Sequence, residues 1–240
     1  MGIKMSGKNR ARWQLAQDYE LNWWKGYRNG VEWYKDFSQK VEDHTKPFLE
    51  INQETKILEI GSGPAGALTF LKSYNKYAID PLEDFFSTKE EWRLFRDPKV
   101  NYQKGKGEEL PYEEDFFDLI IIDNVLDHCE NPILVLDEMN RVLKKGGIIF
   151  CRQNLYNWWS RQMRNIMELM MIDKGHPFTF GKKQLINHFR NRFWEIKKFD
   201  EIGYFKTWID GLSTLTVQGL IKSFLFITRN RTLFILKNQY

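Results

Sequence analysis

The chain has 240 residues, of which 42% are hydrophobic and 28% charged, which is typical of a globular domain with a full core. The net charge is only +4, and the Lys and Arg residues are scattered among acidic ones, so no nucleic-acid partner is expected. Two cysteines imply no disulfide framework and favour a cytoplasmic location. The four histidines show no metal-ligand spacing, so no metal site is expected either.

Aromatic residues recur at spacings of three and four over residues 12–46, a pattern typical of amphipathic helices. Asn29 and Gly30 predict a break between two helices. These rings either pack on the rest of the protein or form a lid that touches a ligand, and the two interpretations are compatible. We therefore expect residues 1–46 to form an N-terminal aromatic helical cap on a main domain at 47–240.

Strands and helices are then predicted to alternate. The expected strands are 56–60, 76–80, 100–103, 116–123 and 148–151, and the expected helices are 64–74, 83–96 and a segment that starts at Asn131 and Pro132. The continuous apolar run Leu119–Ile122 indicates a central strand that is covered on both faces. This alternation predicts an α/β fold with a Rossmann-like, doubly wound and mostly parallel sheet.

The pattern changes after Cys151. An irregular or helical insertion is expected near 153–178, followed by a helix at 182–191 and strands at 194–199 and 232–237. The last pair resembles a hairpin, so we expect the final strand to be antiparallel. The apolar stretch 212–228 is interrupted by polar residues, which favours a core element over a membrane span.

A glycine-rich turn follows the first predicted strand. Gly61, Gly63 and Gly66 match the spacing of a nucleotide-type cofactor turn, and Asp80 ends the second strand 19 residues after Gly61. An acid at that distance suits hydrogen bonds from ribose hydroxyls. The glycines alone would also fit a dinucleotide, whereas Glu59 before them is placed to organise the turn.

Four segments in order resemble the class I S-adenosylmethionine-dependent methyltransferases, especially the ubiquinone and menaquinone methyltransferase group. They are Leu58–Gly66, Tyr77–Pro81, Gly105–Pro111 with Asp115–Ile120, and Glu130–Gly147, with a weaker fifth match at His176–Phe178. The resemblance covers roughly residues 50–200 and implies S-adenosyl-L-methionine as the cofactor.

The resemblance implies roles for individual residues. The cofactor-binding candidates are Tyr19, Glu59, Gly61, Ser62, Gly63, Gly66, Asp80, Pro81, Leu82, Gly107, Glu108, Asp123 and Asn124. Asp80 would accept hydrogen bonds from the ribose, because an ionised carboxylate is an acceptor only. At the adenine end the family usually has an acid where this chain has Lys106, so Glu108 either substitutes for that acid or the loop is shifted.

Methyl transfer is mainly a matter of alignment, and a base is needed only if the acceptor still carries its proton. His128 is the first candidate base and His176 the second, although both also fit structural roles. The acceptor pocket is expected from the aromatic and methionine residues Tyr19, Trp23, Tyr156, Trp158, Trp159, Met163, Met167, Tyr204 and Trp208. Such a pocket favours a small organic acceptor.

Three functions remain open from the sequence. The first is O- or N-methylation of a small molecule. The second is a nicotinamide-dependent oxidoreductase, which the same glycines would allow. The third is a non-catalytic S-adenosylmethionine-binding module, which Lys106 and the lack of an obvious base would allow. The oligomeric state does not follow from the sequence.

Overall fold

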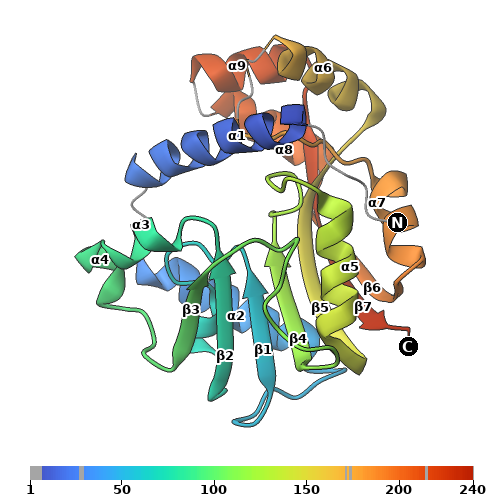
Figure 1. Ribbon diagram of the computed structural model, residues 1–240. Helices are drawn as coiled ribbons and strands as arrows, with labels where there is room; N and C mark the ends of the chain where they lie inside the picture. Colours follow the sequence, from blue (N-terminus) through green and yellow to red (C-terminus); the bar gives the residue numbers. More distant parts are fainter. Residues whose placement is uncertain (1–6, 27–29, 171, 173–174, 214–215, 240) are drawn as a thin grey trace.

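A seven-stranded sheet forms the centre of the molecule, in the order β3-β2-β1-β4-β5-β7-β6 (Figure 1). The structure, a computed structural model, describes residues 7–26, 30–170, 172, 175–213 and 216–239. The strands are β1 (Lys56–Ile60), β2 (Asn75–Asp80), β3 (Val100–Lys104), β4 (Phe117–Asp123), β5 (Leu143–Tyr156), β6 (Phe193–Ile202) and β7 (Arg229–Asn238). Strands β1 to β5 run parallel, and β7 is antiparallel to both of its neighbours. The predicted fold class is confirmed.

Helices lie on both faces of the sheet and beyond the carboxyl ends of its parallel strands. They are α1 (Gly7–Gly26), α2 (Val31–Thr45), the 3-10 helix η1 (Ala67–Phe70), α3 (Glu83–Ser87), α4 (Glu90–Arg93), α5 (Pro132–Val142), α6 (Trp158–Leu169), α7 (Lys182–Arg190), α8 (Tyr204–Ser213) and α9 (Val217–Phe224). Helix α2 covers one face and α5 the other, whereas α1, α6, α8 and α9 lie above the carboxyl ends of the parallel strands (Figure 1). The predicted break near Gly30 is confirmed, while Asn29 lies outside the described residues.

The core has two halves, one on each face of the sheet. Phe37 and Val41 of α2 pack with Leu119 and Ile121 of β4, whereas Ile120 and Ile122 face the side covered by α5 and α7. The run Leu119–Ile122 is at most 1% exposed, which confirms a central strand covered on both faces. Helix α2 therefore packs in this core, whereas α1 does not, so the two N-terminal helices differ in their structural role. The division into a cap at 1–46 and a main domain stays a prediction.

The predicted helix at 64–74 is wrong, because only the 3-10 helix η1 forms there. The carboxylate of Glu59 accepts hydrogen bonds from the amides of Ala67 and Leu68, at 3.1 and 3.2 Å. Lys76 Nζ donates to the carbonyls of Leu68 and Leu71. Buried side chains therefore satisfy backbone groups that a longer α-helix would have paired within itself.

Three further predictions need correction. The helix expected at 83–96 is divided into α3 and α4, and the Thr88 hydroxyl donates to the Phe85 carbonyl at the break. Strand β5 extends to Tyr156, into the expected insertion, because β7 pairs with it along its length. Residues 171, 173 and 174 of that insertion lie outside the described residues.

Most of the described residues of the segment 212–228 lie outside the core, so the expected core element is wrong for them. The segment contributes to α8 and α9, in which Phe224 is 83% exposed, and Phe226 after them is 61% exposed. Trp208 Nε1 donates to the Ser223 carbonyl at 3.0 Å, so the two helices pack mainly on each other and above the sheet. Among the described residues, no helix is both long and apolar enough to span a membrane.

Candidate active site

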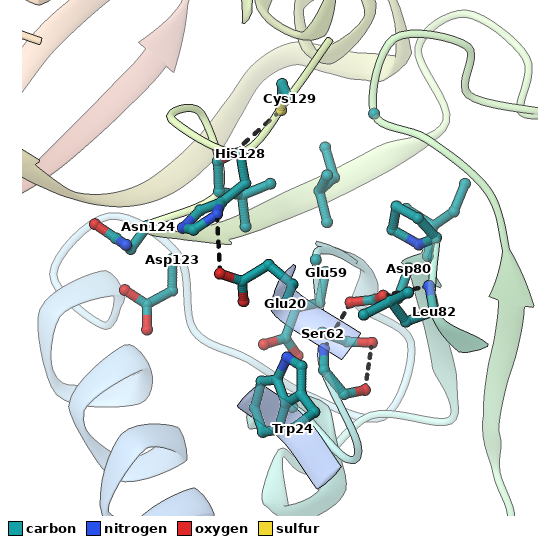
Figure 2. Close-up of a pocket in the computed structure, with 18 of the residues that line it drawn as sticks. Glu20, Trp24, Glu59, Ser62, Asp80, Leu82, Asp123, Asn124, His128 and Cys129 are labelled. Atoms are coloured by element: carbon teal, nitrogen blue, oxygen red, sulfur yellow. Dashed lines mark hydrogen bonds and ion pairs between the residues drawn. The ribbon is translucent and has the colours of Figure 1, made fainter. Parts of the chain in front are cut away.

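One pocket of about 630 Å³ opens over the carboxyl ends of the parallel strands, beneath α1. Its volume lies in the range of ligand-binding cavities, and such sites are common at this edge of α/β sheets. Every residue that the sequence indicated for cofactor binding or catalysis lines this pocket. Their roles in binding and catalysis stay predictions. Figure 2 shows several of these side chains around the cavity.

The glycine turn between β1 and η1 requires its glycines. Gly61, Gly63 and Gly66 have φ angles of 70, 59 and 70°, in the left-handed region. A Cβ atom on Gly66 would stand 2.3 Å from Glu59 Oε2, and one on Gly61 would stand 2.3 Å from Val125 Cγ2. Glu59 is 3% exposed, and burial raises its pKa to about 8. Its carboxylate is used to hold the turn, so a bound molecule would meet the turn rather than this acid.

Asp80 lies at the end of β2, beside the turn. One oxygen accepts the Gly63 amide at 2.9 Å and the other accepts the Leu82 amide at 2.8 Å. Burial raises the pKa of Asp80 to about 6, and the Leu82 and Gly63 amides oppose that rise. Each carboxylate oxygen keeps a second lone pair, so Asp80 can also accept hydrogen bonds from two vicinal hydroxyls. Its geometry fits a ribose.

At the expected adenine end of the pocket, Lys106 and Glu108 are already engaged by other groups of the protein. Lys106 Nζ lies 2.8 Å from Glu130 Oε2 and 3.7 Å from the centre of the Trp13 ring. Glu108 Oε1 accepts hydrogen bonds from the amides of Glu130 and Asn131, at 2.7 and 2.9 Å. Glu108 therefore orders the loop before α5, and the same oxygen is poorly placed to replace the family's missing acid.

The residues at the end of β4 face the next strand. Asp123 forms a two-oxygen ion pair with Arg152 of β5, with 2.7 Å between Oδ1 and Nε. Asn124 adopts a φ of 54° and accepts the Asn154 amide at 3.1 Å. These contacts join the cofactor side of the pocket to β5.

Two histidines from distant parts of the sequence come together. The ring centres of His128 and His176 are 4.6 Å apart, and His128 Nδ1 lies 3.4 Å from Glu20 Oε1. Asp127 is 1% exposed, and its Oδ1 accepts Gln153 Nε2 at 2.8 Å while Oδ2 has no hydrogen-bond partner among the described residues. Ligand atoms of Asp127, His128 and His176 lie within 4.8 Å of one another, a grouping compatible with a metal ion. The histidine spacing in the sequence did not indicate this grouping.

Helix α1, called the lid helix below, contributes pocket residues that sequence patterns indicated only in general terms. Glu20 and Trp24 lie inside the pocket, with Glu20 directed toward His128 (Figure 2). Trp24 packs edge-on against Phe86, with ring centres 5.4 Å apart, and its ring would lie 3.3 Å from a Cβ atom on Gly63. The sequence did not indicate Glu20 and Trp24, because this helix has many polar and aromatic residues and no pattern separates those of a site from those of the surface.

The aromatic wall of the pocket differs from the expected one. Of the nine residues expected there, Tyr19 and Trp23 line the pocket. The other aromatic wall residues are Trp13 and Trp24 of α1 and Trp33, Tyr34 and Phe37 of α2. Trp158 is 71% exposed, and Trp208 stacks on Phe226 with ring centres 6.0 Å apart. The other seven expected residues, which come from the end of β5, from α6 and from α8, do not line this pocket. Trp159 Nε1 instead donates to the Leu225 carbonyl, and Trp208 Nε1 donates to the Ser223 carbonyl.

Comparison with known proteins agrees with this geometry. Residues 58–151 match the methyltransferase domain family. An uncharacterized protein, MJ1123, of Methanocaldococcus jannaschii is 36% identical over 93 residues, 38% of this chain and 41% of that protein. Demethylmenaquinone methyltransferase of Bacillus subtilis is 28% identical over 121 residues, 47% of this chain and 51% of that enzyme. The chain thus spans about half the length, or less, of these relatives.

A solved structure shows the same fold. A putative sarcosine dimethylglycine methyltransferase from Galdieria sulphuraria superposes with a TM-score of 0.66 at 12% identity, over 92% of this chain and 97% of that one. Together with the match of residues 58–151 to the methyltransferase domain family, this likeness supports the fold of a class I S-adenosylmethionine-dependent methyltransferase for the chain. The cofactor of this class is S-adenosyl-L-methionine, and the nicotinamide alternative loses its support.

Proposed function

We propose that this protein transfers the methyl group of S-adenosylmethionine to oxygen or nitrogen of a small organic acceptor. The observation that carries the proposal is the continuity of one pocket, which has the glycine turn and Asp80 at one end and His128 at the other. The family match and the methyltransferases among the relatives support it. A cytoplasmic location stays a prediction from cysteine usage.

The cofactor supplies a methyl group already activated by a positively charged sulfur. The residues of the chain would bind the cofactor, orient the acceptor and take its proton. Asp80 would hold the ribose, and the glycine turn would let backbone amides approach the methionine part. Trp24 would exclude water from above. These contacts supply alignment, which is the larger share of catalysis for such a displacement.

His128 would take the proton that the acceptor's oxygen or nitrogen loses as its new bond to the methyl carbon forms. Glu20 Oε1 lies 3.4 Å from Nδ1, where its carboxylate would accept a hydrogen bond from Nδ1–H and leave Nε2 as the base. His176 packs against the same ring and would fix its position. Glu20 comes from α1, so this base is complete only when the lid helix is in place.

The test combines binding and turnover. Calorimetry with S-adenosylhomocysteine should show binding, and a panel of amines, phenols and quinols should include an acceptor that yields S-adenosylhomocysteine from S-adenosylmethionine. No binding would overturn the proposal. Binding without turnover on the whole panel would instead support the non-catalytic module.

A further inference from the structure

Three arginines gather at one side of the pocket, away from the glycine turn. Arg152 lies on β5, and Arg229 and Arg231 lie on β7. In the antiparallel register Arg152 is opposite Leu233 and Arg231 is opposite Asn154. Cross-strand partners, and residues two apart on a strand, share a face of the sheet. All three arginines therefore belong to one face, and each lines the pocket.

The acids near these arginines are already paired. Asp123 is held by Arg152 through both of its oxygens. Glu201 lies 3.7 Å from Arg152 Nη1 and also binds Lys40, 3.0 Å away. Four cations, the three arginines and Lys40, therefore face two carboxylates. The local charge is positive before any ligand binds.

This arrangement leaves over Arg229, which is exposed, and Arg231, which is half-buried. Within the described part of the chain the guanidinium of Arg231 makes no ion pair or side-chain hydrogen bond. Burial lowers the pKa of Arg231, and the positive charge of Arg152 lowers it further, although Asp123 opposes this. Arginines are seldom left buried without a partner, because desolvating an unpaired charge is costly. A ligand anion would remove that cost.

Asn154 supplies a second unsatisfied group at the same place. It is 5% exposed and lines the pocket, and its Oδ1 has no hydrogen-bond partner among the described residues. It stands directly across from Arg231 on β5, and its backbone amide is tied to Asn124 at the end of β4. A polar amide thus lies between the arginines and the end of β4.

The two arginines of β7 are too far from the glycine turn to serve the methionine end of the cofactor. Strand β7 is three places from β1 in the sheet, through β4 and β5. At about 4.8 Å per place, that is about 14 Å. The aromatic wall from α2 lies on the same side, since Arg152 is 4.6 Å from the centre of the Phe37 ring. The second substrate is the ligand that this region would contact.

We propose that Arg231, with Arg229 and Asn154, binds an anionic group of the methyl acceptor, a carboxylate or a phosphate. The arginine fork matches the paired oxygens of either group. Asn154 would bind a neighbouring polar atom of the same molecule. This proposal rests on the proposed methyltransferase function and adds the charge of its acceptor.

The experiment uses the full chain saturated with S-adenosylhomocysteine, at constant ionic strength. Inorganic phosphate, pyrophosphate and acetate are titrated separately by calorimetry. We expect at least one of them to bind, and Arg231→Gln to weaken that binding tenfold or more. Arg190→Gln is the matched control, because Arg190 is exposed on α7 and does not line the pocket. Phosphate or pyrophosphate binding without acetate would indicate a phosphorylated acceptor, and the reverse would indicate a carboxylate.

Two results would overturn the inference. One is that none of the three anions binds the wild-type complex, and the other is that Arg231→Gln binds them as the wild type does. S-adenosylhomocysteine affinity is measured in parallel, and Arg231→Gln should leave it unchanged. A tenfold loss there would assign the arginines to the cofactor instead. Arg229→Gln, at an exposed position, provides a second variant if Arg231→Gln fails to fold. If the wild type binds no S-adenosylhomocysteine, the methyltransferase proposal fails, whatever the anions do.

Discussion

The two ends of the pocket use their polar side chains in opposite ways. At the cofactor end, Glu59 and Asp80 hold backbone amides of neighbouring turns, and Glu108 caps the loop before α5. At the other end, Asn154 Oδ1 has no hydrogen-bond partner and Arg231 no ion pair among the described residues. The first end is built before a ligand arrives, whereas the second keeps groups that a ligand can complete.

Substitutions at the two ends of the pocket should therefore change different measured properties. Changes at the cofactor end should alter stability and cofactor affinity together. Changes at the far end should alter turnover or acceptor binding while the fold and the cofactor affinity remain.

The largest effect is expected at His128, on the far side. His128→Gln removes the candidate base and should lower kcat by roughly 10²- to 10⁴-fold, with the affinity for S-adenosylhomocysteine unchanged. Steady-state kinetics on the acceptor found in the panel provide the measurement. Glu20→Gln should produce a smaller loss and shift the pH profile of kcat, because Glu20 orients the ring rather than taking the proton. Wild-type kcat in His128→Gln would refute the assignment.

Gly66→Ala should cause the next largest effect, on stability. The added Cβ would stand 2.3 Å from Glu59 Oε2 at a φ of 70°, so we expect a loss of about 2–4 kcal/mol in the free energy of unfolding. Urea titration measures this. Gly203→Ala is the matched control, since no heavy atom of the described residues lies within 4 Å of its Cβ position. Equal stabilities for the two variants would contradict a turn braced by Glu59.

Asp80→Ala should weaken S-adenosylhomocysteine binding by about 1–3 kcal/mol, since a charge-assisted hydrogen bond is lost. Burial raises the pKa of Asp80 to about 6, and only the carboxylate can accept from two hydroxyls. Wild-type affinity should therefore fall as the pH drops below about 6, and the variant should lack this pH dependence. Calorimetry from pH 5 to 8 tests both. Asp84→Ala, an exposed acid on α3, should change neither.

Glu59 should make stability depend on pH. Burial places its pKa near 8, above the ordinary value of 4.5. The folded form thus binds the proton more tightly, and the stability from Glu59 is complete below pH 4.5 and is lost as the pH rises through 8. The steepest slope from one such group is about 1.4 kcal/mol per pH unit. Urea titrations between pH 6.5 and 8 should show this decline in the wild type and a flatter curve in Glu59→Gln.

The smallest effect is expected at Lys106. Its Nζ is engaged by Glu130 and the Trp13 ring, so Lys106→Gln should change S-adenosylhomocysteine affinity by less than about 0.5 kcal/mol. A tenfold change would mean that this lysine contacts the cofactor directly and that the adenine end is built differently from the contacts described above.

Local patterns predicted the cofactor end well because its residues are close in sequence. The run Leu119–Ile122, the turn at Gly61 and the acid Asp80 each occupy a strand or turn whose place follows from hydrophobic pattern and chain direction. The same patterns failed for the helix at 64–74, where buried Glu59 and Lys76 take over backbone groups. Such a tertiary override leaves no periodic trace in the sequence.

The sequence by itself determined the doubly wound sheet, because strands and helices differ in hydrophobic period. The cofactor class followed from the resemblance of four ordered segments to a known family, and the two candidate histidines followed from their positions after a strand and in a turn. Only the tertiary structure decided that Glu20 reaches His128 from the lid helix and that α2 shares the aromatic wall with α1. It also decided that Arg231 faces the pocket without an ion-pair partner among the residues that the structure describes. These contacts join residues many positions apart through packing, and packing depends on the whole chain.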